Sequence, residues 1–333
     1  MAAEDKCKDV VYSSRVRFAR NITGLPFPDK LTGEEEIYSA LMRGAEKALN
    51  SVDTFHMYRM NGLDPLDAQA LVEKHLISPA LVSSRYGAVM ISRLQDISVM
   101  INEEDHIRAQ CIVRGFDLNS AFKRLVDVDK AMAKQLEFAF DNKYGYLTAC
   151  PTNMGAGMRA SFMVFVPALT LTGALNSVLG TLPQFGVTAR GVYGEGSQEK
   201  GFMYQISNQA MIGASEEEIL SRVTKVAESF IRAERAARED LARRGGVDLQ
   251  DKIMRAYGIL CNACKVATNE FMELIAYVKL GIALDFIKAD ADKADELITL
   301  TQPAMLCKAA GKKLNAEERD ITRARIVRNA LAR

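Results

Sequence analysis

The sequence has almost no net charge, no long uninterrupted apolar run and few cysteines, and each of these features excludes a class of protein. Its 333 residues contain 43 Lys and Arg against 42 Asp and Glu, which gives a formal net charge of +1. Such a balance provides no overall field that would capture nucleic acid or an anionic membrane. Any phosphate binding must therefore come from local clusters of charge.

The longest apolar stretch, SFMVFVPALTLTGAL, is interrupted by Pro167 and by threonines. It is shorter than the roughly 18 to 20 residues that a membrane-spanning helix needs. The first residues, MAAEDKCKDVVY, lack the basic and then apolar pattern of a signal peptide. We therefore expect a cytoplasmic protein that has no direct contact with membranes or nucleic acid.

Six cysteines in a chain of this length are too few for a secreted disulfide scaffold. Only Cys261 and Cys264 form a CxxC pair. A zinc site of this type needs a second pair, and a redox motif needs a thioredoxin-like context. We interpret the two cysteines as half-buried thiols on a helix and predict no metal site made by protein ligands.

Three segments have the apolar periodicity of helices. Residues 32–49 and residues from 215 onward each begin with a capping box, in which a Ser or Thr is followed three residues later by Glu. Residues 118–142 are predicted to form another helix. The helix that begins at residue 215 is predicted to end at Gly245–Gly246, which we take as a domain boundary.

Short β-rich runs bounded by Gly, Asn or Pro lie between these helices. They are residues 10–18, 87–94, 97–102, 145–151, 160–166, 186–194 and 203–209. Consecutive strands of this kind favour antiparallel pairing, whereas only helical patterns follow Gly246. The sequence therefore predicts an α+β fold, with a mainly antiparallel sheet flanked by helices and a small all-α domain at the C-terminus.

The stretch VMINEEDHIR, residues 99–108, ends an alternating apolar run in three acids, a histidine and an arginine. In an extended strand alternate side chains point to opposite faces, so only one of Glu103 and Glu104 can face a given ligand. Arg15 and Arg17 are spaced to lie on one strand face, which fits a phosphate clamp. From these residues alone, a solvated strand end and a solvent-facing basic strand stay open as alternatives.

Two glycine-rich stretches are further candidates for phosphate binding. Residues 155–160, GAGMRA, fit GxGxxA but lack the acidic residue and the βαβ context of a dinucleotide fold. Glycines in residues 190–197, RGVYGEGS, would let backbone amides approach phosphate oxygens, although a hairpin loop explains them as well. The sequence has no GxxxxGK[ST] loop and no HRD with DFG, so ATP chemistry here would need another scheme.

Five segments, taken together, resemble the catalytic domain of the guanidino (phosphagen) kinases, in particular the bacterial protein arginine kinases of the McsB type. They are SSRVRFARN, LVEKHLISP, NEEDHIR, CPTNMGAGMRAS and RGVYGEGS. The resemblance implies a guanidino-kinase catalytic domain at residues 10–237 and a helical phosphoarginine-binding domain at residues 247–333. Creatine and arginine kinases carry an extra N-terminal helical domain, and a site without it would favour a protruding side chain over a small substrate.

The resemblance also implies roles for single residues, with ATP and Mg²⁺ as cofactors. Glu104 matches the catalytic carboxylate and Cys150 the reactive cysteine, while Ala156 stands where the family usually has threonine. The segments that match ATP-binding segments contain Ser13, Ser14, Arg15, Val16, Arg17, His75, Arg108, Arg159, Ala160, Ser161, Phe162, Met163, Arg190, Gly191, Val192, Tyr193, Gly194 and Glu195.

The chemistry of guanidine phosphorylation fits these residue types. A guanidinium has a pKa above about 12 and is a poor nucleophile until a carboxylate orients it and takes a proton, which Glu104 would do. Arginines would stabilise the charge on the transferring phosphoryl group. We expect a Glu103→Gln change to be milder than Glu104→Gln, and we interpret His106 as structural.

Near the C-terminus, Asn315 and Glu318 match the start of a helix that contains RDITRA. Arg319 and Arg323 are four residues apart on one face, where a bound phosphate would relieve their repulsion and Asp320 could bind a guanidinium. A solvated helix with an Asp320–Arg323 ion pair explains the pattern too. The resemblance implies a phosphoarginine-binding motif that consists of Arg319, Asp320, Ile321, Thr322, Arg323 and Ala324.

Together, the residues and the resemblance lead us to expect an ATP-dependent kinase of arginine side chains in proteins, which marks proteins for degradation or stress control. The implied partners are protein substrates with exposed arginines, an activator protein, a protease–chaperone machine and a second copy of the chain. Two alternatives stay open. One is a kinase of free arginine or another small guanidine, and the other is an inactive adaptor that reads phosphoarginine.

Overall fold

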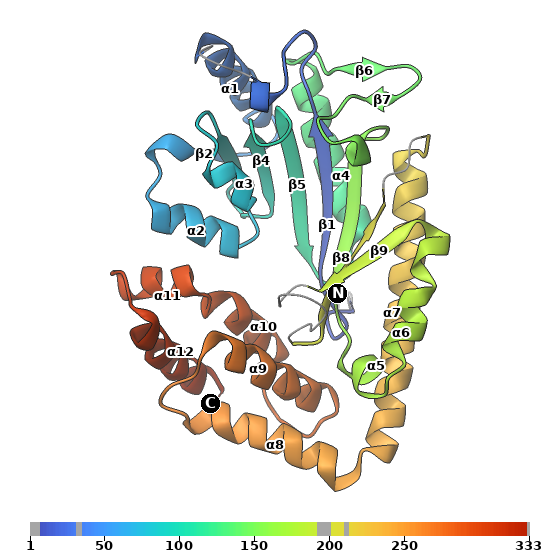
Figure 1. Cartoon of the computed structure of the whole chain (residues 1–333), viewed down its shortest axis with the longest axis vertical. Coiled ribbons are helices and arrows are strands. Elements are labelled where there is room, and N and C mark those ends of the chain that lie inside the picture. The colour runs from blue at the N-terminus through green and yellow to red at the C-terminus, as the bar shows by residue number, and fades with distance from the viewer. Residues whose placement is uncertain (1–6, 31–34, 192–200, 210–212, 332–333) are drawn as a thin grey trace.

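The centre of the structure is an eight-stranded sheet in which every neighbouring pair of strands is antiparallel (Figure 1). This computed structural model describes residues 7–30, 35–191, 201–209 and 213–331. The strand order is β2-β3-β4-β5-β1-β8-β10-β9. The strands are β1 (Val11–Arg20), β2 (Phe55–Arg59), β3 (Ala88–Ser92), β4 (Ile97–Ile101), β5 (Ile107–Arg114), β8 (Met158–Phe165), β9 (Val187–Gly191) and β10 (Met203–Asn208). The predicted α+β fold is confirmed.

Helices pack on both faces of this sheet. On one face, α1 (Glu35–Leu49), α4 (Leu118–Ala133) and α7 (Glu216–Arg244) share the main hydrophobic core with strand residues such as Val16 and Phe162. On the opposite face, α2 (Pro65–Glu73) and α3 (Pro79–Val82) cover β3 and β4. Short helices α5 (Pro167–Leu171) and α6 (Leu175–Gly180) follow β8.

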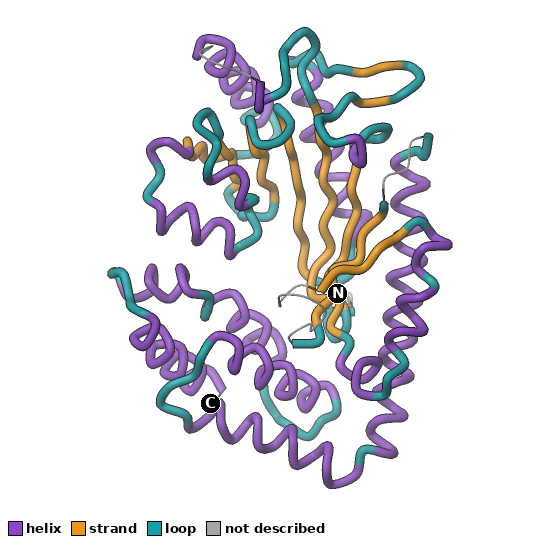
Figure 2. The backbone as a smooth tube through the Cα atoms, viewed as in Figure 1, coloured by secondary structure: helices purple, strands orange, loops and turns teal. Residues whose placement is uncertain are grey.

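After Gly245 the described chain contains helices joined by loops and no strand, as Figure 2 shows. Its helices are α8 (Gly246–Asn262), α9 (Thr268–Ala283), α10 (Ala291–Leu300), α11 (Pro303–Ala310) and α12 (Ala316–Leu331), and they have a hydrophobic core of their own. Ala276 of α9 packs against Met163, Phe165 and Met203 at the end of the sheet. These helices therefore border the same sheet face that α2 and α3 cover, and a cavity lined by Arg15, Glu73, His75 and Gln302 lies between them.

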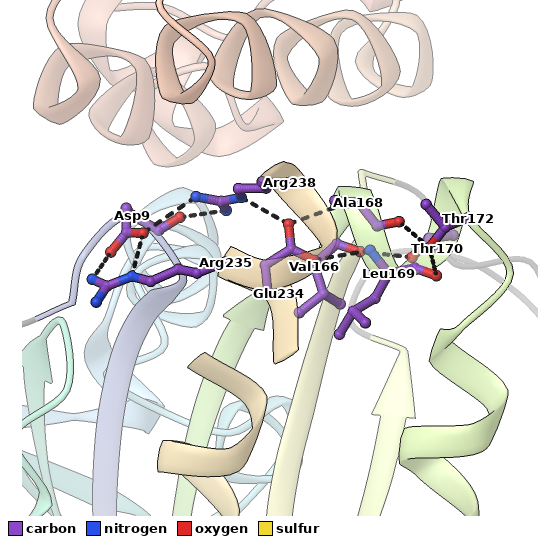
Figure 3. Close-up of polar contacts among 9 residues, drawn as sticks. All are labelled: Asp9, Val166, Ala168, Leu169, Thr170, Thr172, Glu234, Arg235 and Arg238. Atoms are coloured by element: carbon purple, nitrogen blue, oxygen red, sulfur yellow. Dashed lines mark hydrogen bonds and ion pairs between the residues drawn. The ribbon is translucent and has the colours of Figure 1, made fainter. Parts of the chain in front are cut away.

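A carboxylate of α7 caps a neighbouring helix (Figure 3). The fully buried Glu234 accepts hydrogen bonds from the backbone nitrogens of Ala168 and Leu169, at 3.1 and 3.0 Å, at the start of α5. Arg238 donates to Glu234 at 2.8 Å and to the backbone oxygen of Asp9, also at 2.8 Å. The network joins the start of the chain, α5 and α7 into one unit.

The capping box that predicted α7 is present. Ser215 Oγ accepts from the backbone nitrogen of Glu218 at 3.1 Å, and the Glu218 carboxylate accepts from the Ser215 nitrogen at 3.2 Å. The helix ends at Arg244, and α8 begins at once at Gly246. The capping box that was predicted at Thr32 lies outside the described residues.

Two predicted elements are wrong in extent and two strands were missed. The helix predicted for residues 118–142 ends at Ala133, because the chain then forms a hairpin of β6 (Phe140–Asp141) and β7 (Gly145–Tyr146) with edge-on aromatic contacts. The strand predicted for residues 145–151 is only β7, since Pro151 begins a 3-10 turn. Strands β2 and β5 lie outside every predicted element, and β6 falls within the predicted helix.

Two smaller expectations concern helices and thiols. Within the part of the chain that is described, no helix is long and apolar enough to cross a membrane. Cys261 is half-buried near the end of α8, but Cys264 lies beyond the helix and is exposed. The interpretation of two half-buried helical thiols is therefore wrong for Cys264.

Candidate active site

The strand register gathers arginines on the open polar face of the sheet. Arg17 of β1 lies opposite Arg159 of β8, and Ala19 lies opposite Arg108 of β5. Residues that pair directly, or that are two apart in one strand, point to the same face. Arg15, Arg17, Arg108 and Arg159 therefore share one face, as the spacing of the first two predicted.

Arg190 reaches this face at the edge of the sheet. Met163 of β8 pairs with Gln205 of β10, which in turn pairs with Arg190 of β9. The exposed Arg190 and Arg159 line a cavity of about 390 Å³. Gly191 ends β9, whereas the predicted site residues Val192, Tyr193, Gly194 and Glu195 lie outside the described residues.

The charge of these arginines is poorly balanced by the protein. Among the described residues, no carboxylate forms an ion pair with Arg15, Arg17 or Arg159, and the Nε atoms of Arg17 and Arg159 are buried without a hydrogen-bond partner. Burial and the nearby Arg108 and Arg159 lower the pKa of Arg15 to about 10. Burial and Arg15 also hold the pKa of Arg17 well below its usual value. Arginines without a counter-charge and with lowered pKa values are typical of a site that binds an anion.

The NEEDH segment forms the turn between β4 and β5 instead of an extended strand end. Asn102 has a positive φ of 55° and residues 102–106 bend, so the alternation argument does not hold there. The Glu103 carboxylate accepts from Arg108 Nη1 at 2.7 and 2.8 Å and from Ser78 Oγ at 2.6 Å. Burial alone would raise the pKa of Glu103, but Arg108 and Ser78 hold it below its usual value. The Glu103 carboxylate is therefore occupied by its ion pair with Arg108.

Glu104 differs from its neighbour because it forms no ion pair with a described residue. It lines a cavity of about 140 Å³ together with Arg17, Arg108, Arg159 and Cys150. Although Glu104 is exposed, the surrounding protein and the two flanking acids of the NEEDH segment raise its pKa. A raised pKa makes a carboxylate a better proton acceptor. One cavity thus holds the candidate base and part of the candidate phosphate clamp.

Cys150 immediately precedes the 3-10 turn Pro151–Asn153, and its Sγ lies 2.9 Å from Thr152 Oγ1. The rest of this loop is held from below by the buried Arg20, whose Nη1 donates to the carbonyls of Ala156 and Gly157 at 3.2 and 3.3 Å. Gly157 has a φ of 58°, and a Cβ there would lie 2.6 Å from Arg20 Nη1. The loop at Ala156 is thus fixed through its backbone.

His75 lies just after α2 in a left-handed conformation with a φ of 59°. Its carbonyl oxygen accepts from Gln110 Nε2 at 2.7 Å. The imidazole is open to solvent but lies in a concave surface, where the surrounding protein and Arg15 lower its pKa. With Arg15 it lines two adjoining cavities, of about 60 and 340 Å³.

The predicted ATP-binding segments divide into two sets by strand alternation. Ser13, Ser161 and Met163 line the 60 Å³ cavity beside Arg15 and His75. The side chains of Ser14, Val16, Ala160 and Phe162 are buried on the opposite face of the sheet. Ser14 Oγ, for example, donates to the carbonyl of Gly115 at 2.9 Å. His106 is fully buried, and its ring forms hydrogen bonds with the Ile22 nitrogen and the Pro26 carbonyl, as a structural histidine would.

Sequence reasoning missed three residues of this region. Ser78 binds Glu103, Gln110 holds the backbone of His75, and Gln302 lines the 340 Å³ cavity from the α10–α11 junction. Gln110 is two residues beyond Arg108, so recognition of β5 as a strand would have placed both on one face. Gln302 gives no local signal, because its role depends on tertiary contacts.

Two family comparisons cover most of the chain. The family described as ATP:guanido phosphotransferase, C-terminal catalytic domain, matches residues 36–237. The family described as Protein-arginine kinase McsB C-terminal domain matches residues 246–333. The chain belongs to the ATP:guanido phosphotransferase family. The resemblance expected from its five segments is confirmed, and this guanido phosphotransferase is an enzyme.

Relatives support this assignment along the full chain. A protein named protein-arginine kinase from Caldanaerobacter subterraneus subsp. tengcongensis is 45% identical over 330 residues, which cover 97% of each chain. One of the same name from Bacillus subtilis is 41% identical over 327 residues, covering 97% of this chain and 90% of the relative.

Solved structures share the fold of this guanido phosphotransferase. The crystal structure of lombricine kinase matches with a TM-score of 0.60 and 26% identity, over 69% of this chain and 67% of that one. The substrate-free duplicated taurocyamine kinase from Schistosoma mansoni has a TM-score of 0.62 at 21% identity, over 95% of this chain and 50% of that one, and shows the fold alone.

The RDITRA segment of this guanido phosphotransferase lies on α12, and its helix start is capped by Asn315 and Glu318 as expected. Arg323 is fully buried. Its guanidinium donates to the carbonyls of Thr301 and Val266, to Thr268 Oγ1 and to Asp320, at 2.7 to 3.1 Å. The Asp320–Arg323 ion pair that the sequence left as an alternative is therefore present.

Phosphoarginine binding by this segment stays a prediction. Arg319 and Thr322 are half-buried, Ile321 is exposed and Ala324 is buried. Because Arg323 is already bound by four acceptors, a ligand on this helix would depend mainly on Arg319.

Proposed function

We propose that this enzyme transfers the γ-phosphoryl group of ATP to arginine side chains of proteins. The observation that carries this proposal is the shared cavity of Glu104 and the unpaired arginines of the sheet face. ATP enters as the substrate that the family name gives. Arginine in proteins enters from the name of the relatives and of the C-terminal family.

The geometry of the site supports a proposal for how the two substrates bind. The ATP phosphates bind along Arg15, Arg17, Arg108 and Arg159, and the nucleoside lies toward His75. The target guanidinium enters the cavity of Glu104 and Cys150. This arrangement would bring the attacking nitrogen and the γ-phosphorus together at the arginine cluster, where positioning is a large part of catalysis.

Glu104 acts as anchor and base in this scheme. Its carboxylate orients the guanidinium and accepts the proton that the attacking nitrogen loses. A bond forms between that nitrogen and the γ-phosphorus, while the bond from the γ-phosphorus to the β–γ bridging oxygen breaks and ADP leaves. The arginines stabilise the negative charge on the transferring group. Glu103 keeps Arg108 in place throughout.

Mg²⁺ is proposed to bind together with the nucleotide. Within the described part of the chain, no group of three or more His, Cys, Asp or Glu is placed to hold a metal ion. We propose that phosphate oxygens and water hold most of the ion, which is common for Mg²⁺ at phosphate sites. When bound, it would neutralise part of the phosphate charge.

The remaining expectations belong to this proposal. We propose a catalytic domain at residues 10–237 and a helical phosphoarginine-binding domain at residues 247–333, in a cytoplasmic protein. A role in degradation or stress control, an activator protein, a protease–chaperone partner and a homodimer are predictions from the resemblance. Free arginine as substrate and an inactive phosphoarginine reader are the alternatives.

One experiment separates these alternatives. The enzyme is incubated with Mg²⁺, ATP labelled in the γ-phosphate and either an arginine-rich protein or free arginine, with Glu104→Gln as control. We expect acid-labile label on protein arginines, located by mass spectrometry. Label on free arginine alone would support the small-guanidine kinase, and binding of phosphoarginine without any transfer would support the adaptor.

A further inference from the structure

A carboxylate of the catalytic region caps a helix of the C-terminal region. Helix α11 begins at Pro303, and Gln302 before it makes no side-chain cap. The backbone nitrogens of Ala304 and Met305 instead donate to the two oxygens of Glu73, at 2.9 and 3.0 Å. The first turn of a helix has unsatisfied N–H groups and a partial positive charge, so an anion is favoured there.

No ion pair with a described residue competes with the hydrogen bonds between Glu73 and the first turn of α11. No described residue forms an ion pair with its half-buried carboxylate, whereas the similar cap Glu234 is bound by Arg238 (Figure 3). The same α2–α11 contact also contains an exposed ion pair between Asp67 and Lys308, and Leu66 packs beside Leu306. Glu73 is thus the residue of α2 that binds the backbone of α11 directly.

Helix α2, which supplies the capping carboxylate, leads directly to the candidate nucleotide site. Glu73 is the last residue of α2, and His75 follows two residues later in its left-handed conformation. A left-handed conformation is costly for a residue other than glycine and persists only where its surroundings fix it. The end of α2 and Gln110 fix His75 from two sides. Helix α2 packs on β3 and β4 through Leu71 and Val72, and Glu73 adds its hydrogen bonds to α11.

The C-terminal region also forms a wall of the site. Gln302 lines the 340 Å³ cavity together with Arg15, Glu73, His75 and Arg108. Its Nε2 donates to the Ile298 carbonyl at 2.8 Å, which fixes the side chain at the end of α10. A shift of α11 would therefore move a wall of the cavity and act, through Glu73, on the end of α2 that precedes His75.

We propose that Glu73 is a positioning residue, which couples the C-terminal helices to ATP binding by fixing His75. The inference rests on the proposed function, because it takes His75 to lie at the nucleotide. Glu73 does not touch the reacting atoms. Its loss changes ATP affinity and leaves the rate at saturating ATP nearly intact.

The test measures MgATP affinity by calorimetry and the separate kinetic constants. Glu73→Ala removes both acceptors, and we expect the Kd for MgATP to rise about three- to thirtyfold, the range typical of coupling between linked sites. The KM for ATP rises in parallel. The KM for the arginine substrate and kcat at saturating ATP stay within about twofold of wild type. Glu73→Gln keeps one acceptor oxygen, so we expect a smaller rise in the Kd. This variant provides the test if Glu73→Ala folds poorly.

Two controls separate positioning from a general loss of structure. Asp67→Asn breaks the ion pair with Lys308 in the same contact, and it leaves ATP affinity unchanged. In a His75→Ala background, Glu73→Ala has no further effect on ATP affinity. An equal loss in Asp67→Asn, a full effect of Glu73→Ala without His75, or equal falls in all constants would overturn the proposal. Failure of the wild type to bind ATP would be a separate result, which rejects the proposed function itself.

Discussion

Two groups of arginines in this molecule differ in how the protein satisfies their charge. On the sheet face, Arg15, Arg17 and Arg159 repel one another and have no described carboxylate partner. On α12, Arg323 is buried as deeply as any residue, yet four acceptors surround its guanidinium. Both sites were predicted to bind phosphate from short arginine motifs.

The difference indicates which motif the fold leaves available to a ligand. A buried cation without a counter-charge destabilises the free protein, so an anion that binds there relieves the cost. A buried cation whose donors are already used stabilises the protein and offers little to a ligand. The sheet face therefore has the electrostatics of a binding site, and Arg323 has those of a structural brace.

The largest effect is expected at Glu104, the proposed base beside the sheet face. Glu104→Gln removes the base without touching the arginines, so transfer should fall by about 10² to 10⁴ while ATP affinity changes little. Steady-state rates with ATP calorimetry measure both. Retention of more than about a tenth of the wild-type rate would show that Glu104 is not the base.

A change at Arg323, on the other side of the comparison, should lower the stability of the fold. Arg323→Met fills the site but leaves Asp320 and buried carbonyls without their donor, so the free energy of unfolding should fall by roughly 3 kcal/mol or more. Urea unfolding measures this. Wild-type stability in this variant would mean that the hydrogen bonds around Arg323 contribute little, and would reopen it as a free ligand residue.

Arg17→Met is the matched change on the sheet face. It removes a half-buried cation that forms no ion pair with a described residue and that is repelled by Arg15, Arg108 and Arg159. Stability should therefore stay within about 1 kcal/mol of wild type or rise. The affinity for ATP should fall by about 10- to 100-fold, because a charge-assisted contact to phosphate is lost. Unfolding and calorimetry on the same sample give both quantities. A clear loss of stability would contradict the comparison.

How far the sequence predicted these sites depends on the range of the contacts. That Arg15 and Arg17 share one face follows from strand alternation. The start of α7 follows from its capping box, and both are local rules. The roles of Glu103 and Glu104 do not, because the positive φ of Asn102 turns the chain and cancels the alternation.

Contacts between distant segments were beyond the sequence. The surroundings of Arg323 come from Val266, Thr268 and Thr301, and Glu73 caps a helix 231 residues away. The missed strand β5 hid the position of Gln110. Local pattern predicted the fold class and the shared face of Arg15 and Arg17, and the family resemblance implied most other candidate residues. Tertiary packing decided which of the arginines have no carboxylate partner among the described residues.

Glu103→Gln should produce an intermediate effect. The amide keeps one acceptor for Arg108 but loses the charge, so activity should fall about tenfold, less than for Glu104→Gln. The pKa of Glu103 is held below its usual 4.5, so its ionised form stabilises the fold above that pH and the gain is lost as pH falls through the lowered pKa. Rates and unfolding against pH test this. An effect as large as that of Glu104→Gln would give Glu103 a direct part in the chemistry.

The smallest effect is expected at Arg319, where the comparison can be sharpened. If α12 binds phosphoarginine, the half-buried Arg319 must supply most of the new contact, because the donors of Arg323 are occupied. Arg319→Ala should weaken phosphoarginine binding about three- to tenfold, as expected for a partly exposed charged contact, without lowering stability. Titration with phosphoarginine, phosphoserine and arginine measures this. Equal affinity for all three ligands would identify a nonspecific basic surface, and an unchanged Arg319→Ala would leave α12 as a structural helix whose arginine motif serves packing alone.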